Sequence, residues 1–137
     1  FMKIIAVGKL QTAGIKESFQ HYHKQLKHIE VIEIKESTLE KESSEIMKYL
    51  KDEKHIMACV IETEVLDTHS FCKLYEDHMQ TVFVIGGSHG LDQQIKNMAH
   101  QHISFSKMTF PHQLARLILI EQIFRCEKIK QNHPYHK

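Results

Sequence analysis

The sequence lacks the features that mark membrane-spanning, secreted or disulfide-stabilised proteins. It has no apolar run near the roughly 20 residues that a membrane-spanning helix needs, and its first apolar stretch is too short for a signal peptide. The three cysteines, Cys59, Cys72 and Cys126, are odd in number and widely spaced, so they match neither a CxxC motif nor a disulfide framework. These absences favour a protein of the reducing cytoplasm.

The chain also lacks internal repeats, low-complexity tracts and linkers. Its 42% hydrophobic and 26% charged residues are typical of a folded globular protein, and 137 residues suffice for one core. We therefore expect a single domain over residues 1–137. Phe1 precedes Met2, and we expect it to be an addition to the natural start.

Signatures of several enzyme classes are missing as well. No HExxH motif or Cys/His cluster accompanies the twelve histidines, so we expect structural or surface histidines and no metal. Ser106 lies outside any GxSxG motif, and we do not expect hydrolysis at Ser106 or at Ser88. Gly86, Gly87 and Gly90 do not form the GxGxxG fingerprint, and they have no phosphate-loop lysine. The glycines alone are as consistent with a plain strand-to-helix turn as with a ligand site.

The net charge of +1 is unevenly distributed. Five lysines and one glutamate give +4 over residues 1–29, whereas five lysines and ten acids give −5 over residues 30–64. Six basic residues and two glutamates give +4 over residues 104–137. Basic ends could form a positive face for a polyanion, and ordinary surface charge is the alternative.

Strand-like and helix-like segments alternate along the chain. Short apolar or alternating runs predict strands at residues 3–7, 29–34, 56–61, 81–85 and 102–106. Helical spacing of apolar residues predicts helices at residues 15–28, 39–51, 70–79, 91–100 and 111–131. This alternation predicts an α/β fold with a mainly parallel five-stranded sheet covered by helices on both faces.

The last predicted helix is apolar around more than one stripe, which indicates burial on two sides. The sheet would cover one side and a second copy of the chain the other, so we expect a homodimer. Ile120 and Phe124 are predicted to contact that copy. Glu121 precedes Arg125 by four residues, the favoured spacing for a helical ion pair.

Two predicted strands end in loops suited to a ligand. The strand at residues 81–85 runs into Gly86 and Gly87, and the strand at residues 102–106 runs into a loop that stops at Pro111. In open α/β sheets, ligands bind beyond such strand ends. The second loop has a phenylalanine on each side, which could stack a purine, and core packing is the alternative.

Four segments together resemble the ribosomal RNA large-subunit methyltransferase H family, the small single-domain branch of the SPOUT methyltransferases. They are residues 2–10, 83–91, 103–113 and 133–137. The resemblance implies a trefoil knot near the C-terminus, against the usual absence of knots, and a homodimer that binds S-adenosylmethionine. It also implies methyl transfer to the N3 atom of a pseudouridine in a large-subunit ribosomal RNA hairpin on the assembled ribosome.

The resemblance assigns most cofactor contacts to two loops. They fall on Gly86, Phe105, Ser106, Lys107, Met108, Thr109 and Phe110. A further family contact is a leucine followed by an acid at the end of the third strand. The ungapped alignment places Cys59 and Val60 there, and a shifted alignment places Ile61 and Glu62 there.

Catalysis is expected to need a base, or a group that stabilises an anion, because the N3 proton must leave. The candidates are His136, Tyr135 and Arg116, with His112 behind them, and the choice among them stays open. The tail at residues 132–137 is expected to reach an active site across the dimer.

The sequence is also compatible with two other functions. The altered segment at residues 59–65 is compatible with a non-catalytic ribosome- or RNA-binding relative whose cofactor site has degenerated. The strand and helix pattern alone is also compatible with a doubly wound nucleotide-binding regulator. Cofactor binding separates the enzyme from both alternatives.

Overall fold

Five parallel strands form one sheet in the order β2-β1-β4-β3-β5 in the computed structural model, which describes residues 2–137. The strands are β1 (Met2–Val7), β2 (Ile29–Ile34), β3 (His55–Cys59), β4 (Thr81–Ile85) and β5 (Gln101–Ile103). All four neighbouring pairs run parallel. The predicted α/β fold with a five-stranded sheet is confirmed. The expectation about Phe1 lies outside the described residues.

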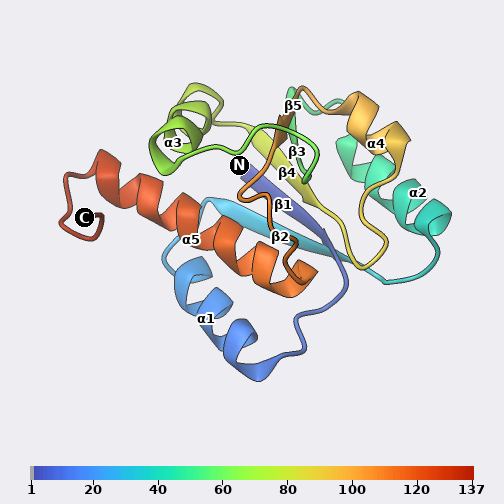
Figure 1. Cartoon of the computed structure of the whole chain (residues 1–137), viewed down its shortest axis with the longest axis horizontal. Coiled ribbons are helices and arrows are strands. Elements are labelled where there is room, and N and C mark those ends of the chain that lie inside the picture. The colour runs from blue at the N-terminus through green and yellow to red at the C-terminus, as the bar shows by residue number, and fades with distance from the viewer. Residues whose placement is uncertain (1) are drawn as a thin grey trace.

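Helices cover both faces of this sheet. They are α1 (Ala13–His23), α2 (Leu39–Leu50), α3 (Thr68–Asp77), α4 (Gln93–Met98) and α5 (His112–Lys130). Figure 1 shows α5 crossing one face with α1 and α3 beside it, while α2 and α4 lie together on the other side. No helix within residues 2–137 combines the length and the apolar character that crossing a membrane requires.

The side chains of β1 alternate between two hydrophobic cores. Ile4 and Ala6 pack into the core that α1, α3 and α5 complete, whereas Ile5 and Val7 pack into the core that α2 and α4 complete. Successive side chains of a strand point to opposite faces, so a strand covered on both faces needs a continuous apolar run. For the same reason β4 is buried along its whole length.

Side-chain caps set the starts of three helices. The side chains of Thr38, Asp67 and Asp92 each accept a hydrogen bond from a backbone amide in the first turn of α2, α3 and α4, respectively. Such a cap contributes about 1 kcal/mol, because the first amides of a helix have no partner within it. These caps place each helix directly after the loop that follows a strand.

Several elements are shorter than the sequence predicts. The helix α1 ends at His23 instead of residue 28, because the chain turns there toward β2. The Leu26 amide donates to the His23 carbonyl at 3.0 Å, and a ring nitrogen of His23 lies 2.9 Å from the Ile29 carbonyl. Leu26 is buried as its helical spacing suggests, but a turn buries it.

A disulfide joins Cys72 on α3 to Cys126 on α5, with a Cα–Cα distance of 5.2 Å. The expectation that the cysteines form no disulfide is therefore wrong. The two residues are 54 positions apart, and only the packing of α3 against α5 brings them together. No spacing pattern in the sequence could show this pairing. Cys59 remains a free thiol.

The helix α5 is apolar on both its inner and its outer side. Ile120 and Phe124 are 0% and 6% exposed and pack into the core, so the choice of these two residues as contacts with a partner is wrong. Leu114 and Ile118 lie one turn apart and stay partly exposed. The outer side of α5 therefore carries apolar residues, as the sequence suggests, but they are Leu114 and Ile118 and not Ile120 and Phe124.

Candidate functional site

The carboxyl ends of β3, β4 and β5 surround a crevice of about 190 Å³, and the first turn of α5 borders it. Parallel strands place their carboxyl ends at one edge of the sheet, which is where open α/β sheets bind ligands. The lining comes from residues 59–62, from residues within 85–91 and 104–110, from Lys96 of α4, and from His112 and Ala115 of α5.

The turn after β4 depends on its glycines for its own shape. The Gly90 amide donates to the Gly87 carbonyl at 3.0 Å, and Gly90 has a φ of +71°, in the left-handed region that favours glycine. A Cβ on Gly86 would lie 2.5 Å from the carbonyl carbon of Gly90. Gly86 is therefore needed because the turn folds back on itself, whatever approaches it from outside.

The loop after β5 is held by its own hydroxyls. The Ser104 hydroxyl donates to the Ser106 carbonyl at 3.0 Å, and the Met108 amide donates to the Ser106 hydroxyl at 2.9 Å. The Phe105 ring packs edge-on against Phe71 of α3, with 6.3 Å between centroids. These contacts hold one wall of the crevice without using a charged group.

Most of the predicted cofactor contacts meet at this crevice. Those that line it are Cys59, Gly86, Phe105, Ser106, Met108 and Phe110. Lys107 and Thr109 belong to the same loop but are exposed and lie outside the lining. The structure thus brings three distant segments together, and their binding of a cofactor stays a prediction.

The end of β3 brings the Cys59 thiol to the crevice, and the segment after it brings the Glu62 carboxylate, whereas the ungapped alignment points to Cys59 alone. Burial raises the pKa of the Cys59 thiol to about 12, so it stays neutral at physiological pH. The Val60 amide donates to the Ile103 carbonyl at 2.9 Å, which continues the sheet. Glu62 also lines the crevice and pairs with Lys96 at 2.6 Å. The shifted alignment points to Glu62, whereas nothing in the sequence points to Lys96.

Arg116 lies in the interior, with 1% of its side chain exposed. It pairs with Glu33 at 2.6 Å and donates to the carbonyls of Gly8 and Val7 at 2.8 and 3.2 Å. Arg116 therefore ties α5 to the ends of β1 and β2, because all of these hydrogen bonds go to groups of the protein. Its neighbour His112 lines the crevice.

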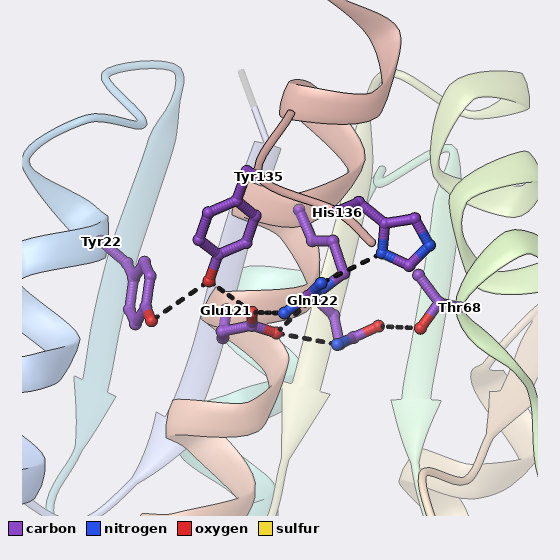
Figure 2. Close-up of polar contacts among 7 residues, drawn as sticks. Tyr22, Thr68, Glu121, Gln122, Tyr135 and His136 are labelled. Atoms are coloured by element: carbon purple, nitrogen blue, oxygen red, sulfur yellow. Dashed lines mark hydrogen bonds and ion pairs between the residues drawn. The ribbon is translucent and has the colours of Figure 1, made fainter. Parts of the chain in front are cut away.

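The tail folds back onto α5 of its own chain, as Figure 2 shows. Tyr135 donates to Glu121 at 2.7 Å and lies 3.4 Å from the Tyr22 hydroxyl, while Arg125 donates to Nδ1 of His136 at 3.0 Å. The predicted ion pair between Glu121 and Arg125 is confirmed, at 2.6 Å. These five residues of α1, α5 and the tail thus share one polar network, which extends through Gln122 to Thr68 of α3.

This network sets the protonation of its members. Burial raises the pKa of Glu121, but the hydrogen bonds from Arg125 and Tyr135 outweigh it and leave the pKa below its ordinary value. Burial and the contacts with Tyr22 and Glu121 raise the pKa of Tyr135, so it stays a hydrogen-bond donor. Arginine can only donate, so Nδ1 of His136 accepts and the neutral ring carries its proton on Nε2.

The three predicted catalytic residues do not meet in one chain. Tyr135 and His136 lie in the tail, against the distal half of α5. Arg116 lies near the start of α5 and contacts the ends of β1 and β2. Within residues 2–137, no group of three or more His, Cys, Asp or Glu side chains is arranged to hold a metal ion. Catalytic roles for these residues stay predictions.

Comparisons with known proteins agree on one family over the full length. A family model described as "predicted SPOUT methyltransferase" matches residues 1–136. The ribosomal RNA large subunit methyltransferase H of Acholeplasma laidlawii is 42% identical, and the match covers 99% of each chain. The protein of the same name from Parasynechococcus marenigrum is 40% identical over 98% of this chain and 95% of its own.

Solved structures show the same fold at much lower identity. A probable methyltransferase from Bordetella pertussis has a TM-score of 0.66 at 11% identity and covers 91% of this chain and 93% of its own. A probable methylase family protein from Haemophilus influenzae has a TM-score of 0.62 at 9% identity and covers 99% of this chain and 70% of its own.

Proposed function

The chain belongs to the SPOUT methyltransferase family, and on this premise we propose that it uses S-adenosylmethionine to methylate N3 of a pseudouridine in large-subunit ribosomal RNA. Full-length similarity to proteins named for methylation of large-subunit ribosomal RNA supports the substrate class. The observation that carries the proposal is the meeting of the glycine turn, the loop at residues 104–110 and the first turn of α5 around one crevice.

The lining of the crevice fits an adenosine-type cofactor. Leu91, Phe105 and Phe110 offer apolar surface for a purine ring, and Ser106 adds a hydroxyl. The volume of about 190 Å³ is below the roughly 300–1,000 Å³ of most ligand pockets, so part of a bound cofactor would extend past the mouth. When bound, S-adenosylmethionine supplies a methyl group activated on a sulfonium centre.

The protein's own task is then to position the target base and to manage its N3 proton. In-line methyl transfer depends mainly on positioning and the exclusion of water, and it requires no nucleophile from the protein. Nε2 of His136 presents a donor, which suits it to stabilise negative charge as the proton leaves, whereas the Tyr135 hydroxyl donates to Glu121. Lys137 completes the tail with a positive charge that can meet a phosphate.

We place the RNA over the edge of the sheet that holds the crevice. Lys9, Lys35 and Lys107 follow β1, β2 and β5 at this edge, and all three are exposed. Lysines near a substrate site neutralise phosphates and give binding that weakens with salt. The exposed Glu36 lies among them, so individual lysines, rather than a uniformly basic face, mark the contacts. A ribosomal substrate also implies a cytoplasmic location.

We further propose that a second copy covers the outer side of α5 to form a homodimer. Leu66, Phe71, Phe105 and Ile118 line a groove between α3 and α5, together with the polar residues Asp67, Thr68 and Gln122. A partner docked there would lie against the loop at residues 104–110 and near the tail. One chain's tail could then serve the other chain's crevice. We also propose that the chain forms the trefoil knot that the resemblance to the family implies.

Titration with S-adenosylmethionine by calorimetry, followed by methylation of ribosomes that lack the modification, tests the function. We expect saturable binding at one site per chain and incorporation of one methyl group per ribosome. Binding of ribosomes without any affinity for the cofactor would instead identify a non-catalytic relative. Incorporation at another nucleotide would retain the enzyme class and refute the pseudouridine assignment.

A pair of lysine substitutions tests the homodimer. Ile118→Lys places a charge on the outer side of α5 and should yield a folded monomer in light scattering. Ile120→Lys places the same charge in the core and should prevent folding, because an unpaired buried charge is strongly destabilising. A monomeric wild type at micromolar concentrations would contradict the proposal.

A further inference from the structure

Glu62 and Lys96 contribute opposite charges to a crevice whose lining is otherwise made of apolar side chains, glycines, hydroxyls and His112. Glu62 follows β3 and Lys96 belongs to α4, so two separate elements bring the charges to the same place. Neither residue is part of the polar network around the tail. The pair therefore needs an explanation of its own.

The contacts of the pair leave bonding capacity free on both partners. One carboxylate oxygen of Glu62 accepts from Lys96 at 2.6 Å, and the other accepts from the Ile61 amide at 3.0 Å. A carboxylate can accept about four hydrogen bonds and an ammonium group can donate three. At least one acceptor position and two donor positions thus remain beside each other at the crevice.

The carboxylate is charged under physiological conditions. The hydrogen bond from Lys96 lowers the pKa of Glu62, and backbone amides lower it further. Most of the Lys96 side chain is covered, whereas that of Glu62 is largely exposed, so a ligand at the mouth of the crevice can reach the carboxylate. A partly exposed ion pair contributes little to folding, so stability alone gives little reason for its position.

We propose that Glu62 and Lys96 bind the amino-acid end of the cofactor, with Glu62 accepting from the α-ammonium group and Lys96 donating to the α-carboxylate. The inference rests on the proposed function. A zwitterion carries its two charges one carbon apart, and an adjacent acceptor and donor complement it. The purine would then occupy the apolar part of the crevice, and the amino-acid end would lie at its mouth.

Two ligands that differ mainly in the amino-acid end separate this contact from the rest of the site. S-adenosylhomocysteine carries the zwitterion, and methylthioadenosine carries the adenine, ribose and sulfur without it. In calorimetry, Glu62→Gln and Lys96→Met should each weaken S-adenosylhomocysteine about tenfold or more, the range for hydrogen bonds to charged groups. Both variants should bind methylthioadenosine within about twofold of the wild type. Glu64→Gln, an exposed neighbour outside the lining, is the matched control.

The double variant with Glu62→Lys and Lys96→Glu restores an ion pair with its charges exchanged. It should not recover the affinity for S-adenosylhomocysteine, whereas a merely structural pair would recover it. An equal loss for both ligands, or no loss for either, would overturn the inference while leaving the proposed function intact. A wild type that binds neither ligand would overturn the proposed function and the inference with it.

Discussion

The two ends of α5 serve different purposes. Its first turn borders a crevice whose mainly apolar walls leave space for a ligand. Its distal half carries Glu121 and Arg125, whose hydrogen bonds are taken up by Tyr135 and His136 of the same chain. The first turn of α5 thus borders a space for a ligand, whereas its distal half holds the tail in place without a substrate. Preorganised groups of this kind reduce the reorganisation that a reaction would otherwise require.

The distance between the two ends limits what one chain can do alone. Ala115, the last residue of α5 that lines the crevice, and Glu121 of the tail network are six residues apart, which corresponds to about 9 Å along the helix axis. No residue of the tail network lines the crevice of its own chain. This separation supports the proposal that the tail acts on the crevice of a second copy.

Removing the tail should have the largest effect on activity. Deletion of residues 135–137 should lower the methylation of ribosomes roughly a hundredfold to ten-thousandfold, because the groups that manage the N3 proton are lost. Affinity for S-adenosylmethionine should change by less than about twofold, since the crevice is intact. Lys130→Ala, at the exposed end of α5, is the control. Wild-type turnover by the truncated protein would show that the tail has no catalytic part.

Reducing the disulfide should lower the stability of the whole domain and leave the crevice able to bind its ligand. Cys72 and Cys126 close a loop of 54 residues, so reduction should lower the free energy of unfolding by about 3–4 kcal/mol in urea titrations. Cofactor affinity should persist, because neither cysteine lines the crevice. The double variant with serine at both positions should match the reduced protein and be insensitive to dithiothreitol. Equal stability of oxidised and reduced wild type would count against the bond.

Two glycine substitutions test how the turn after β4 shapes the crevice. Gly86→Ala should weaken S-adenosylmethionine about tenfold or more, because its Cβ would meet the Gly90 backbone at 2.5 Å and open the turn. Gly90→Ala meets no atom within 4 Å and should cost about 1 kcal/mol of stability through its positive φ alone. Calorimetry and thermal unfolding measure the two effects. Equal losses of affinity would contradict this account of Gly86.

The smallest effect is expected from pH at the tail end. The pKa of Glu121 is lowered on folding, so its contribution is full above the ordinary carboxyl value of 4.5 and is lost as the pH falls through the lower folded value. Glu121→Gln should cost about 1 kcal/mol at pH 7 and less at pH 3, measured by urea unfolding. Glu45→Gln, in the exposed pair with Lys48, is the control and should cost little, because exposed ion pairs contribute little to stability. A pH-independent cost would contradict the charged network.

Local patterns predicted most of the fold and part of the site. Each strand and helix has its own apolar period, so the elements could be identified one at a time, although the turn at residues 24–28 shortened α1. The loops around Gly86 and Phe105 were identifiable because each interrupts such a pattern. Their meeting at one crevice follows from the rule that the carboxyl ends of parallel strands share an edge.

Features that depend on distant contacts could not be predicted. The pairing of Cys72 with Cys126 requires α3 and α5 to pack together, which neither segment reveals alone. The same holds for Lys96, which helical spacing presents as an ordinary surface lysine until α4 docks beside β3. The contacts of Arg116 with Gly8 and Glu33 are likewise invisible in the sequence, because they join α5 to the ends of β1 and β2.

The order of the strands and helices along the chain has a consequence for biosynthesis. In the centre of the sheet Lys3 pairs with Val82, so β1 waits for β4 during translation. One core waits longer still, because α5 supplies Leu119 and Ile123 to it. Such non-local pairing folds slowly, and exposed apolar surface attracts chaperones and aggregation until it is covered. Part of one face of the sheet therefore stays uncovered in the nascent chain until α5 has left the ribosome.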